Sequence, residues 1–433
     1  MTVTAWRNWA GNQRATAATA LRPTTVEEIA TTVRDAVTAG RRIKAVGSGH
    51  SFSDIAVADD IRVDLSGLAA TPTVDRAARL VTVPGGLPLH ALNALLATHG
   101  LAMPNLGDID AQTIAGAIAT GTHGTGAGVG CLSTFVAGLT LVTGEGEVIH
   151  CSPDERPDVF AAAQVGLGAV GVVTEVTLRC SEGFVLRADE RPLPLATLLA
   201  DLDAHIADND HFEFFWLPYT ERTLTKRNNR TAADDRPLSR ARAWWDDDFL
   251  QNTVLGTLCR LGRVAPGLAP ALSRAEARVL SPRVYTARSD AAFVSPRRVR
   301  FTEMEYGVPR AALPEAFAGL RRVIDALPFK VLMPVEVRFT AADDIWLSHG
   351  YGRDSAYIAI HQFDGAPYEP YFRAFEEVAQ ALGGRPHWGK LHYRDAESLR
   401  AAYPRFDDFR AVRDKLDPHR VFANPYLDRV LGP

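Results

Sequence analysis

A histidine that directly follows a glycine-rich loop is the strongest chemical feature of the sequence. The segment reads Ala45-Val46-Gly47-Ser48-Gly49-His50-Ser51-Phe52 and ends an apolar run. Because Gly47 and Gly49 lack Cβ atoms, the backbone can reach positive φ, and successive N–H groups can converge on a pyrophosphate. The dinucleotide fingerprint G-x-G-x-x-G does not match, since Phe52 replaces its third glycine. The ring of His50 suits covalent attachment to a flavin, and the alternative is a turn with a hydrogen-bonded histidine.

A second cluster of small residues covers residues 107–126, GDIDAQTIAGAIATGTHGTG. Small side chains contribute little to a core, so the cluster predicts a close approach of the backbone to a bound molecule or to another element. A flexible linker is the alternative. Ile109, Ile114 and Ile118 interrupt the glycines as they would in a packed segment.

A carboxylate and a guanidinium share one face of a predicted strand. In VLMPVEVRFT, from residue 331, Glu336 and Arg338 are two residues apart, and Val335, Val337 and Phe339 take the other face. Such a pair can position a polyhydroxylated substrate and stabilise negative charge that develops beside it. An ordinary surface ion pair is the alternative.

Two further polar residues stand in apolar surroundings. His361, within YIAIHQF, fits a general base or a substrate ligand, or equally a buried histidine with satisfied hydrogen bonds. Lys390 ends the segment GRPHWGK, which resembles a P-loop, but Leu391 cannot supply the hydroxyl that binds Mg²⁺. We interpret Lys390 as a fixed cation for an anionic ring or a substrate oxygen, or else as a structural lysine. Hydrolase signatures of the G-x-S-x-G and H-E-x-x-H types are absent.

The composition indicates an enzyme-sized protein of at least two domains. The chain has 433 residues, of which 46% are hydrophobic, and 47 Lys+Arg against 51 Asp+Glu give a net charge of −4 without long basic runs. We expect no nucleic-acid partner. The four scattered cysteines predict neither a metal site nor a disulfide framework. Residues 1–7 lack a signal-peptide pattern and no run of about 18 apolar residues occurs, so we predict a cytoplasmic protein without a transmembrane segment.

The elements expected around the first loop form a β-α-β beginning. A helix over residues 23–39 has Thr24 or Thr25 as its N-cap and ends at Gly40, and the strand 42–46 then leads into the glycine loop. Further strands are expected at 61–65 and 80–83, a helix at 88–99, and strands around a helical patch within 136–149 and 169–179. A domain boundary is expected near residues 181–183.

The second half predicts an antiparallel sheet with helices on one face. Alternating strands begin near residues 211, 299, 331 and 356, and helices are expected over 311–326 and 370–382. The polar stretch over 226–240 is expected to be an exposed loop. The predicted fold class is therefore α+β.

Five motifs, taken in order, resemble one known family. AVGSGHSFSD (45–54), GDIDAQTIAGAIATGTHGTG (107–126), MPVEVRF (333–339), HWGK (387–390) and NPYL (424–427) are similar to the aldonolactone oxidoreductase branch of the vanillyl-alcohol-oxidase, or PCMH-type, flavoproteins. The resemblance implies a PCMH-type FAD-binding domain of two α/β subdomains over 1–182 and a substrate-binding cap over 183–391. Residues 392–433 would return to the FAD domain.

The same resemblance implies roles for individual residues. His50 would carry FAD on its ring, and Val173 would lie near the adenine. Glu336 would hold substrate hydroxyls, Arg338 would help to remove the hydroxyl proton or stabilise the anionic reduced flavin, and Lys390 would lie near flavin N1, with His361 as a further candidate. The pyrophosphate would be lined by Gly47, Ser48, Gly49, Ser51, Thr113, Gly116, Thr120, Gly121, Thr122 and His123.

Two positions bear on the reaction. Asp108 stands where alditol oxidases have a serine, which favours a lactone substrate, and Gly107 occupies a position where a small residue lets O₂ reach the flavin. The family implies oxidation of an L-gulono-, L-galactono- or D-arabinono-1,4-lactone to an enediol lactone, with O₂ or a soluble electron acceptor and no metal. An alditol oxidase acting on a polyol is the alternative, and a binding module without activity is a third possibility.

Overall fold

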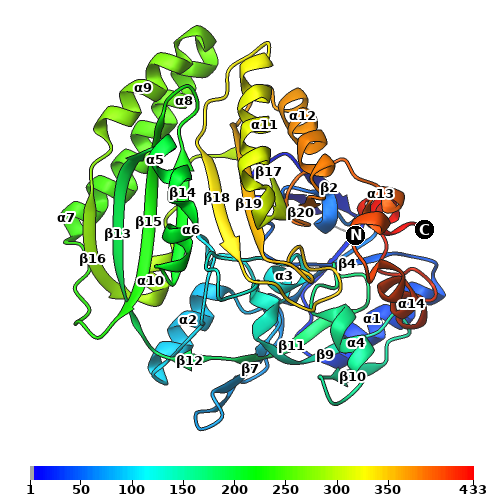
Figure 1. Cartoon of the computed structure of the whole chain (residues 1–433). Helices are drawn as coiled ribbons and strands as arrows, with labels where there is room; N and C mark the ends of the chain where they lie inside the picture. The colour runs from blue at the N-terminus through cyan, green and yellow to red at the C-terminus, as the bar shows by residue number, and fades with distance from the viewer. Residues whose placement is uncertain (1–3) are drawn as a thin grey trace.

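The computed structural model describes residues 4–433, so the first three residues of the N-terminal segment analysed above lie outside it. Figure 1 shows a large sheet on one side of the molecule, coloured green to orange, beside a region built from the blue and cyan N-terminal elements and the red C-terminal helices. The mixture of helices with a mainly antiparallel sheet confirms the predicted α+β class.

The large sheet has eight strands, and every neighbouring pair is antiparallel. All of its strands come from residues after 184, and β11 (Val172–Arg179) ends shortly before them. In spatial order the strands are β16 (Arg283–Arg288), β13 (Val185–Pro194), β15 (Arg222–Thr231), β14 (His211–Trp216), β18 (Val335–Thr340), β19 (Ser355–Phe363), β17 (Phe301–Pro309) and β20 (Arg385–Pro386).

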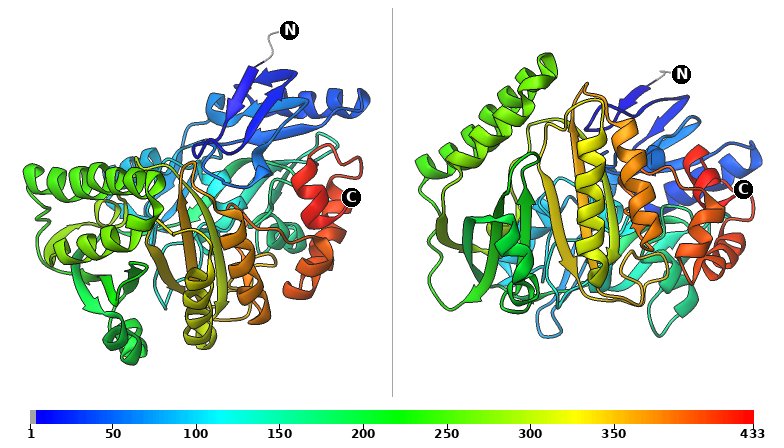
Figure 2. Two further views of the ribbon diagram at one scale, coloured as in Figure 1. Left: turned by 90° about the horizontal axis from the view of Figure 1, so that it is seen from above. Right: turned by 45° about the horizontal axis from the view of Figure 1, so that its top comes forward.

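Helices cover both faces of this sheet, not one face as the sequence predicts. Helices α5 (Leu195–Ala200), α6 (Leu202–Ala207), α11 (Leu313–Ala326) and α12 (Glu369–Ala381) bury one hydrophobic core with the strands. On the other face lie α7 (Arg240–Ala243), the π-helix η4 (Trp244–Val254), α8 (Leu255–Val264) and α9 (Ala269–Val279), as the view from above shows (Figure 2). The sequence predictions include no helix between residues 240 and 279, although the apolar residues of α8 and of α9 do form one stripe on each helix.

The N-terminal region contains a three-stranded and a five-stranded sheet, besides two pairs of short strands. A parallel one has the order β3 (Thr19–Leu21), β5 (Ile61–Asp64), β4 (Ile43–Val46), and helix α1 (Val26–Thr38) connects β3 to β4. The side chain of Thr25 caps α1 by accepting a hydrogen bond from Glu28 N–H. The second sheet has the order β10 (Val148–Cys151), β9 (Val136–Val142), β11, β7 (Leu80–Pro84), β6 (Thr73–Asp75), all antiparallel.

Helices and short elements complete this region. They include α2 (Leu89–Thr98), α3 (Ile114–Ala119) and α4 (Pro157–Ala163), and the paired short strands β1 (Thr4–Arg7) with β2 (Arg14–Ala17) and β8 (Leu101–Ala102) with β12 (Ser181–Glu182). The C-terminal helices are α13 (Ala396–Ala402), α14 (Phe406–Leu416) and α15 (Pro425–Leu431). None of the helices in residues 4–433 is long and apolar enough to span a membrane.

The C-terminal segment returns to the N-terminal region. Ile43 N–H donates to the Val421 carbonyl at 2.7 Å, which joins β4 to the loop before α15. The Asn424 amide donates to the carbonyls of Asp54, Ile55 and Val57 at 3.0–3.2 Å. These contacts hold in place both ends of the glycine-rich loop that follows β4. We propose that the FAD-binding domain consists of residues 1–182 together with 392–433, and that residues 183–391 form the substrate-binding cap.

The predicted exposed loop over 226–240 is wrong in its first part, whereas residues 232–239 do form an exposed loop. Residues 226–231 belong to β15, where Lys226 is buried and pairs in register with Glu213 of β14. The run KRNNRT contains no apolar residue, so nothing in the sequence indicates burial. Its inward charge can be buried because charged side chains on neighbouring strands compensate it. The other predicted strands and helices are present within a few residues of their expected ends.

Candidate active site

Strand alternation places a row of ionisable side chains on one face of the large sheet. On β18, Val335, Val337 and Phe339 face the hydrophobic core with α11 and α12, so Glu336 and Arg338 face the opposite side. The same alternation on the neighbouring strands turns Glu213, Glu303, Glu305 and His361 to that side. Sequence reasoning found the pair on β18 and His361 but missed the three glutamates.

A cavity of about 650 Å³ lies between this face and the loops of the N-terminal region. Its volume is in the range of small-molecule sites. The residues predicted to act on the substrate or near the flavin ring line it, and so do four residues predicted to line the pyrophosphate. The first group is His50, Gly107, Asp108, Glu336, Arg338, His361 and Lys390, and the second is Ser51, Thr120, Thr122 and His123.

A narrower groove continues from this cavity under the glycine-rich loop. It is lined by Gly47, Ser48, Gly49, Thr113, Gly116 and Val173, among others, while His50, Ser51 and Thr120 line both spaces. A Cβ added at Gly47 would lie 2.4 Å from Thr113 Oγ1, and Gly49 has φ +71°, so both positions require glycine. A molecule that extends from groove to cavity therefore passes His50.

Lys44 gives the groove a buried cation. Its ammonium donates to the carbonyls of Phe422 at 3.2 Å and Gly168 at 3.4 Å, and it has no carboxylate within ion-pair distance among residues 4–433. Burial lowers the pKa of Lys44 to about 7. An anion in the groove would offset this desolvation, as the diphosphate of a dinucleotide would. The glycine loop and Lys44 together fit the nucleotide part of FAD.

The neutral ring of His50 stands where groove and cavity meet. Burial, assisted by the nearby Lys390 ammonium, lowers the pKa of His50 below its ordinary value. The ring stacks on Trp9 with centroids 5.8 Å apart, and Trp9 N–H donates to the Gly49 carbonyl at 2.7 Å. Its orientation is therefore fixed, and its uncharged nitrogen can act as a nucleophile.

Arg338 joins three carboxylates that come from different elements. Its Nε lies 2.9 Å from Glu213 Oε2, its Nη2 lies 2.8 Å from Asp108 Oδ1, and Nη2 also contacts Glu336. The register explains the first contact, since Phe214 pairs with Val337 and so places Glu213 beside Arg338. Lys226 Nζ, 2.8 Å from Glu213 Oε1, and Arg297, in contact with Asp108, balance the remaining charge.

The carboxylates of this network differ in proton affinity. Burial alone would raise the pKa of Asp108, but Arg338, Lys226 and Arg297 hold it well below its usual range. Burial and the Asp108 and Glu213 carboxylates raise the pKa of Glu336 to about 7, against the opposing effect of Arg338. Glu336 is thus the member that can change its protonation state near neutral pH.

Lys390 belongs to a second ion-pair group. Its ammonium contacts Glu303 of β17, and Glu303 Oε1 also lies 3.4 Å from His361 Nε2. The ring nitrogen His361 Nδ1 lies 3.0 Å from the Pro334 carbonyl. Burial would raise the pKa of Glu303, but Lys390 and His361 lower it to about 2. The position of Lys390 is fixed further because Phe52 N–H donates to the Gly389 carbonyl at 2.7 Å.

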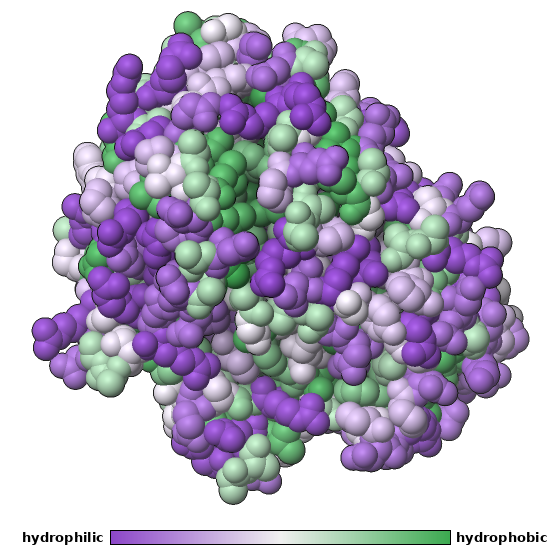
Figure 3. Space-filling view, viewed as in Figure 1, coloured by the Kyte–Doolittle hydropathy of each residue, from purple (hydrophilic) through white to green (hydrophobic). Residues whose placement is uncertain are grey.

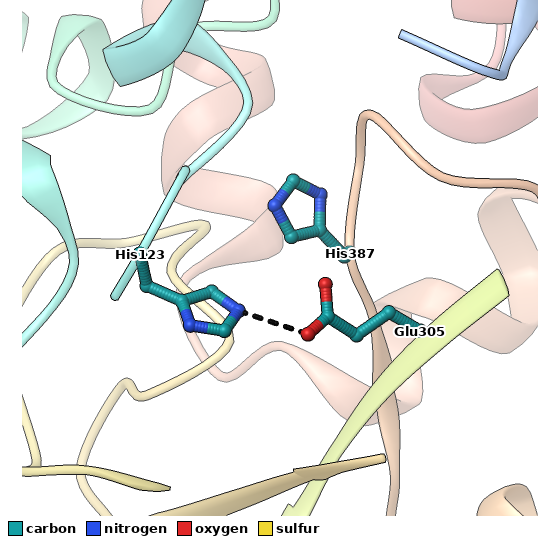
Figure 4. Close-up of side chains that lie close together, drawn as sticks. All are labelled: His123, Glu305 and His387. Carbon is teal, nitrogen blue, oxygen red and sulfur yellow. Dashed lines mark ion pairs between the residues drawn. The ribbon is translucent and has the colours of Figure 1, made fainter. Parts of the chain in front are cut away.

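Two histidines and a glutamate converge deeper in the cavity (Figure 4). His123 Nε2 lies 3.4 Å from Glu305 Oε1, and His387 lies close to both. The spacing of these three groups would suit a metal ion. His387 Nδ1 accepts from Gly389 N–H at 3.0 Å, so the neutral His387 ring carries its proton on Nε2 and cannot bind a metal through that nitrogen. We assign no metal to them.

Gly121 and His123, both predicted to line the pyrophosphate, have other surroundings, and Asp108 lies on the substrate side. Gly121 lines neither space. Its φ is +69° and an added Cβ would lie 2.7 Å from His349 Cε1, so it serves the turn after α3. His123 lies in the large cavity beside Glu305, away from the groove that fits the pyrophosphate. Asp108 binds Arg338 and Arg297, which connects it to the substrate side of the cavity.

Comparison with known protein families gives two matches. The family described as "D-arabinono-1,4-lactone oxidase" matches residues 176–430, and the family described as "FAD binding domain" matches residues 17–152. The first match covers the large sheet and the C-terminal helices, and the second covers the glycine-rich loop and the cluster from 107 to 126.

Individual relatives align over almost the whole chain. An L-gulono-1,4-lactone dehydrogenase of Mycobacterium tuberculosis is 44% identical, with 99% of each chain covered. An L-gulonolactone oxidase of Bos taurus is 34% identical with 98% of each covered, and an alditol oxidase of a Streptomyces species is 33% identical with 99% of each covered. Among solved structures, a solvent-stable cholesterol oxidase has a TM-score of 0.85 at 19% identity, with 100% of this chain and 98% of that chain covered, which shows a shared fold.

Proposed function

The chain belongs to the D-arabinono-1,4-lactone oxidase family, and we propose on this basis that it uses FAD to oxidise the secondary hydroxyl of an aldono-1,4-lactone. The observation that carries the proposal is that the glycine groove, His50 and the charged cavity adjoin one another. The glycine groove leads past His50 into a cavity where Glu336 and Arg338 lie on one side and Lys390 on another. A cavity lined by several charged side chains suits a small polyhydroxylated ring.

The charged groups have distinct tasks in this reaction. FAD, when bound, accepts a hydride from the carbinol carbon. Glu336 accepts a hydrogen bond from the reacting hydroxyl or its neighbour and, when ionised, takes up the hydroxyl proton, while Arg338 stabilises the oxygen that this proton leaves. Lys390 supplies a positive charge at the edge of the cavity nearest the glycine loop, where negative charge accumulates during the transfer.

Anaerobic mixing with candidate substrates tests the proposal. The purified protein is mixed with L-gulono-1,4-lactone, D-arabinono-1,4-lactone or xylitol. The loss of the visible flavin absorbance at about 450 nm is then followed. Bleaching by a lactone is the expected result. Bleaching by xylitol alone would instead indicate an alditol oxidase, and a colourless preparation would contradict the assignment of a flavin.

We propose that FAD is linked covalently through His50. The neutral, oriented ring at the junction of groove and cavity supports this linkage. In His50→Ala, acid precipitation is expected to release all of the flavin into the supernatant, whereas wild-type protein keeps its colour in the pellet. Trp9→Phe, which keeps an aromatic contact, serves as the matched control and should retain the bond. A yellow His50→Ala pellet would refute the linkage.

Glu336 gives the reaction a predicted pH dependence. Because the pKa of Glu336 is raised to about 7, the carboxyl is protonated below that pH and then can no longer take up the hydroxyl proton, although its second oxygen still accepts hydrogen bonds. The rate of flavin bleaching at low lactone concentration should therefore fall about tenfold per pH unit below 7. Glu336→Gln should be slower at every pH and should lose this slope. An unchanged slope in Glu336→Gln would assign the titration to another group.

The electron acceptor and the compartment are further parts of the proposal. Gly107 lines the catalytic cavity, and an added Cβ would lie in tight contact with the His123 carbonyl oxygen at 3.2 Å. The absence of a side chain keeps this part of the wall open, and we infer that O₂ is admitted there. Rapid return of flavin colour on admitting air would indicate an oxidase, and slow return a dehydrogenase.

All four cysteines are unpaired and buried, which supports a reducing compartment such as the cytoplasm.

A further inference from the structure

A second cavity lies on the same face of the large sheet as the catalytic cavity, over its outer strands. Its volume is about 330 Å³, and it is a partly open space between the outer strands of the sheet and helices η4, α8 and α9. Most of its lining surface is apolar, although seven ionisable side chains also line it. The apolar side chains are Phe215, Leu217, Leu224, Leu250, Val254, Leu255, Leu258, Val279, Leu280 and Pro334.

The two cavities share part of their walls. Phe215, Leu255, Ser295, Arg297 and Pro334 line both of them. Ser295 N–H donates to the Asp108 carbonyl at 3.0 Å, which holds the shared segment against the catalytic loop. A molecule in the apolar cavity is therefore separated from the catalytic cavity by single side chains, of which Arg297 is the charged one.

One polar group in the apolar cavity has no partner. The carboxyl of Glu276 on α9 makes no hydrogen bond or ion pair with any described residue, although other charges of the lining pair with each other, such as Glu190 with Arg283 at 2.8 Å. Burial raises the pKa of Glu276 to about 7. Near neutral pH it can therefore donate a hydrogen bond to a carbonyl oxygen.

The surface around this cavity is also hydrophobic. Of the eight large hydrophobic side chains exposed among residues 4–433, seven lie between residues 244 and 284, on η4, α8, α9 and the elements joined to them. Viewed as in Figure 1, hydrophobic side chains gather in a hollow in the upper part of the molecule, beside these helices (Figure 3). An apolar molecule would meet a favourable surface before entering.

We propose that this apolar cavity binds an uncharged one- or two-ring quinone that serves as an electron acceptor. The inference rests on the proposed function, because the electrons come from the lactone. The carbinol loses two electrons and two protons when it becomes a carbonyl, and a quinone that takes up two electrons and two protons leaves as a hydroquinone. The flat apolar ring fits the lining, and its carbonyl oxygens can accept hydrogen bonds from Glu276 and Arg297.

Two tryptophan variants on the same helix test the proposal. Leu258 lines the cavity, whereas Leu261, which is 50% exposed, does not. Leu258→Trp should fill the cavity and weaken binding of menadione to the oxidised holoenzyme at least tenfold by calorimetry. Leu261→Trp should bind menadione as wild type does. Lactone-dependent flavin bleaching should be unchanged in both, and anaerobic menadione reduction should decline only in Leu258→Trp.

Other outcomes would overturn the proposal. Equal menadione affinity in the two variants would place its site elsewhere. Displacement of menadione by dodecanoate with similar affinity would show apolar binding without recognition of the ring carbonyls. Slower bleaching by the lactone in Leu258→Trp would make the cavity part of the substrate site. Since calorimetry needs no lactone, failure of the quinone site can be separated from failure of the proposed function.

Discussion

Arg338→Ala is expected to slow lactone-dependent flavin bleaching by roughly 10³-fold, the size of effect found when an oriented electrostatic group is removed from an active site. Arg338 is 11% exposed and contacts Asp108, Glu213 and Glu336. Without it, these carboxylates repel one another, and the pKa of Glu336 rises further above about 7. The variant thus loses both the cation beside the reacting oxygen and the ionised form of Glu336.

Stopped-flow measurement at saturating lactone gives the bleaching rate, and the bound flavin is quantified separately. Arg338→Lys is the matched control, because it keeps the charge but not the separate contacts made by Nε and Nη2. We expect it to regain part of the lost rate. FAD content should stay near that of wild type in both, since Arg338 does not line the groove under the glycine loop. An unchanged bleaching rate in Arg338→Ala would remove this residue from the mechanism.

Much of the site is predictable because strand alternation and loop chemistry are local properties. The sequence around Gly47 and Gly49 demands an unusual backbone, and the apolar residues around Glu336 and Arg338 define which face is buried. The partners of these residues depend on strand register, which is a tertiary property. Glu303 pairs directly with His361, and that pairing is visible only once β17 and β19 are aligned.

The same reasoning explains what the sequence missed. Glu213, Glu303 and Glu305 alternate with apolar or aromatic residues in HFEFFW and FTEMEYG, so the signal for inward carboxylates was present. A carboxylate on an inward face requires a cation from another strand, and Lys226 was hidden in a stretch that resembled a loop. Buried charged residues therefore made β15 resemble a loop, whereas on β18 they indicated the site.

Lys390→Met is expected to reduce the bleaching rate by about 10²-fold while retaining the length of the side chain. The change removes the ammonium that contacts Glu303. Burial raises the pKa of Glu303, and in the variant only His361 would oppose that effect. The pKa of Glu303 should rise from about 2, so the variant should show a new pH dependence that wild type lacks.

A double variant separates two roles of Lys390. If the ammonium acts on the flavin edge directly, Glu303→Gln should keep most of the activity, because Lys390 remains charged. The double variant Glu303→Gln/Lys390→Met should then be as slow as Lys390→Met. If the ammonium only neutralises Glu303, the double variant should recover the rate, since the buried carboxylate is then gone. We expect no recovery, because Lys390 lines the cavity next to His50, and a fixed cation there stabilises charge only while it is present.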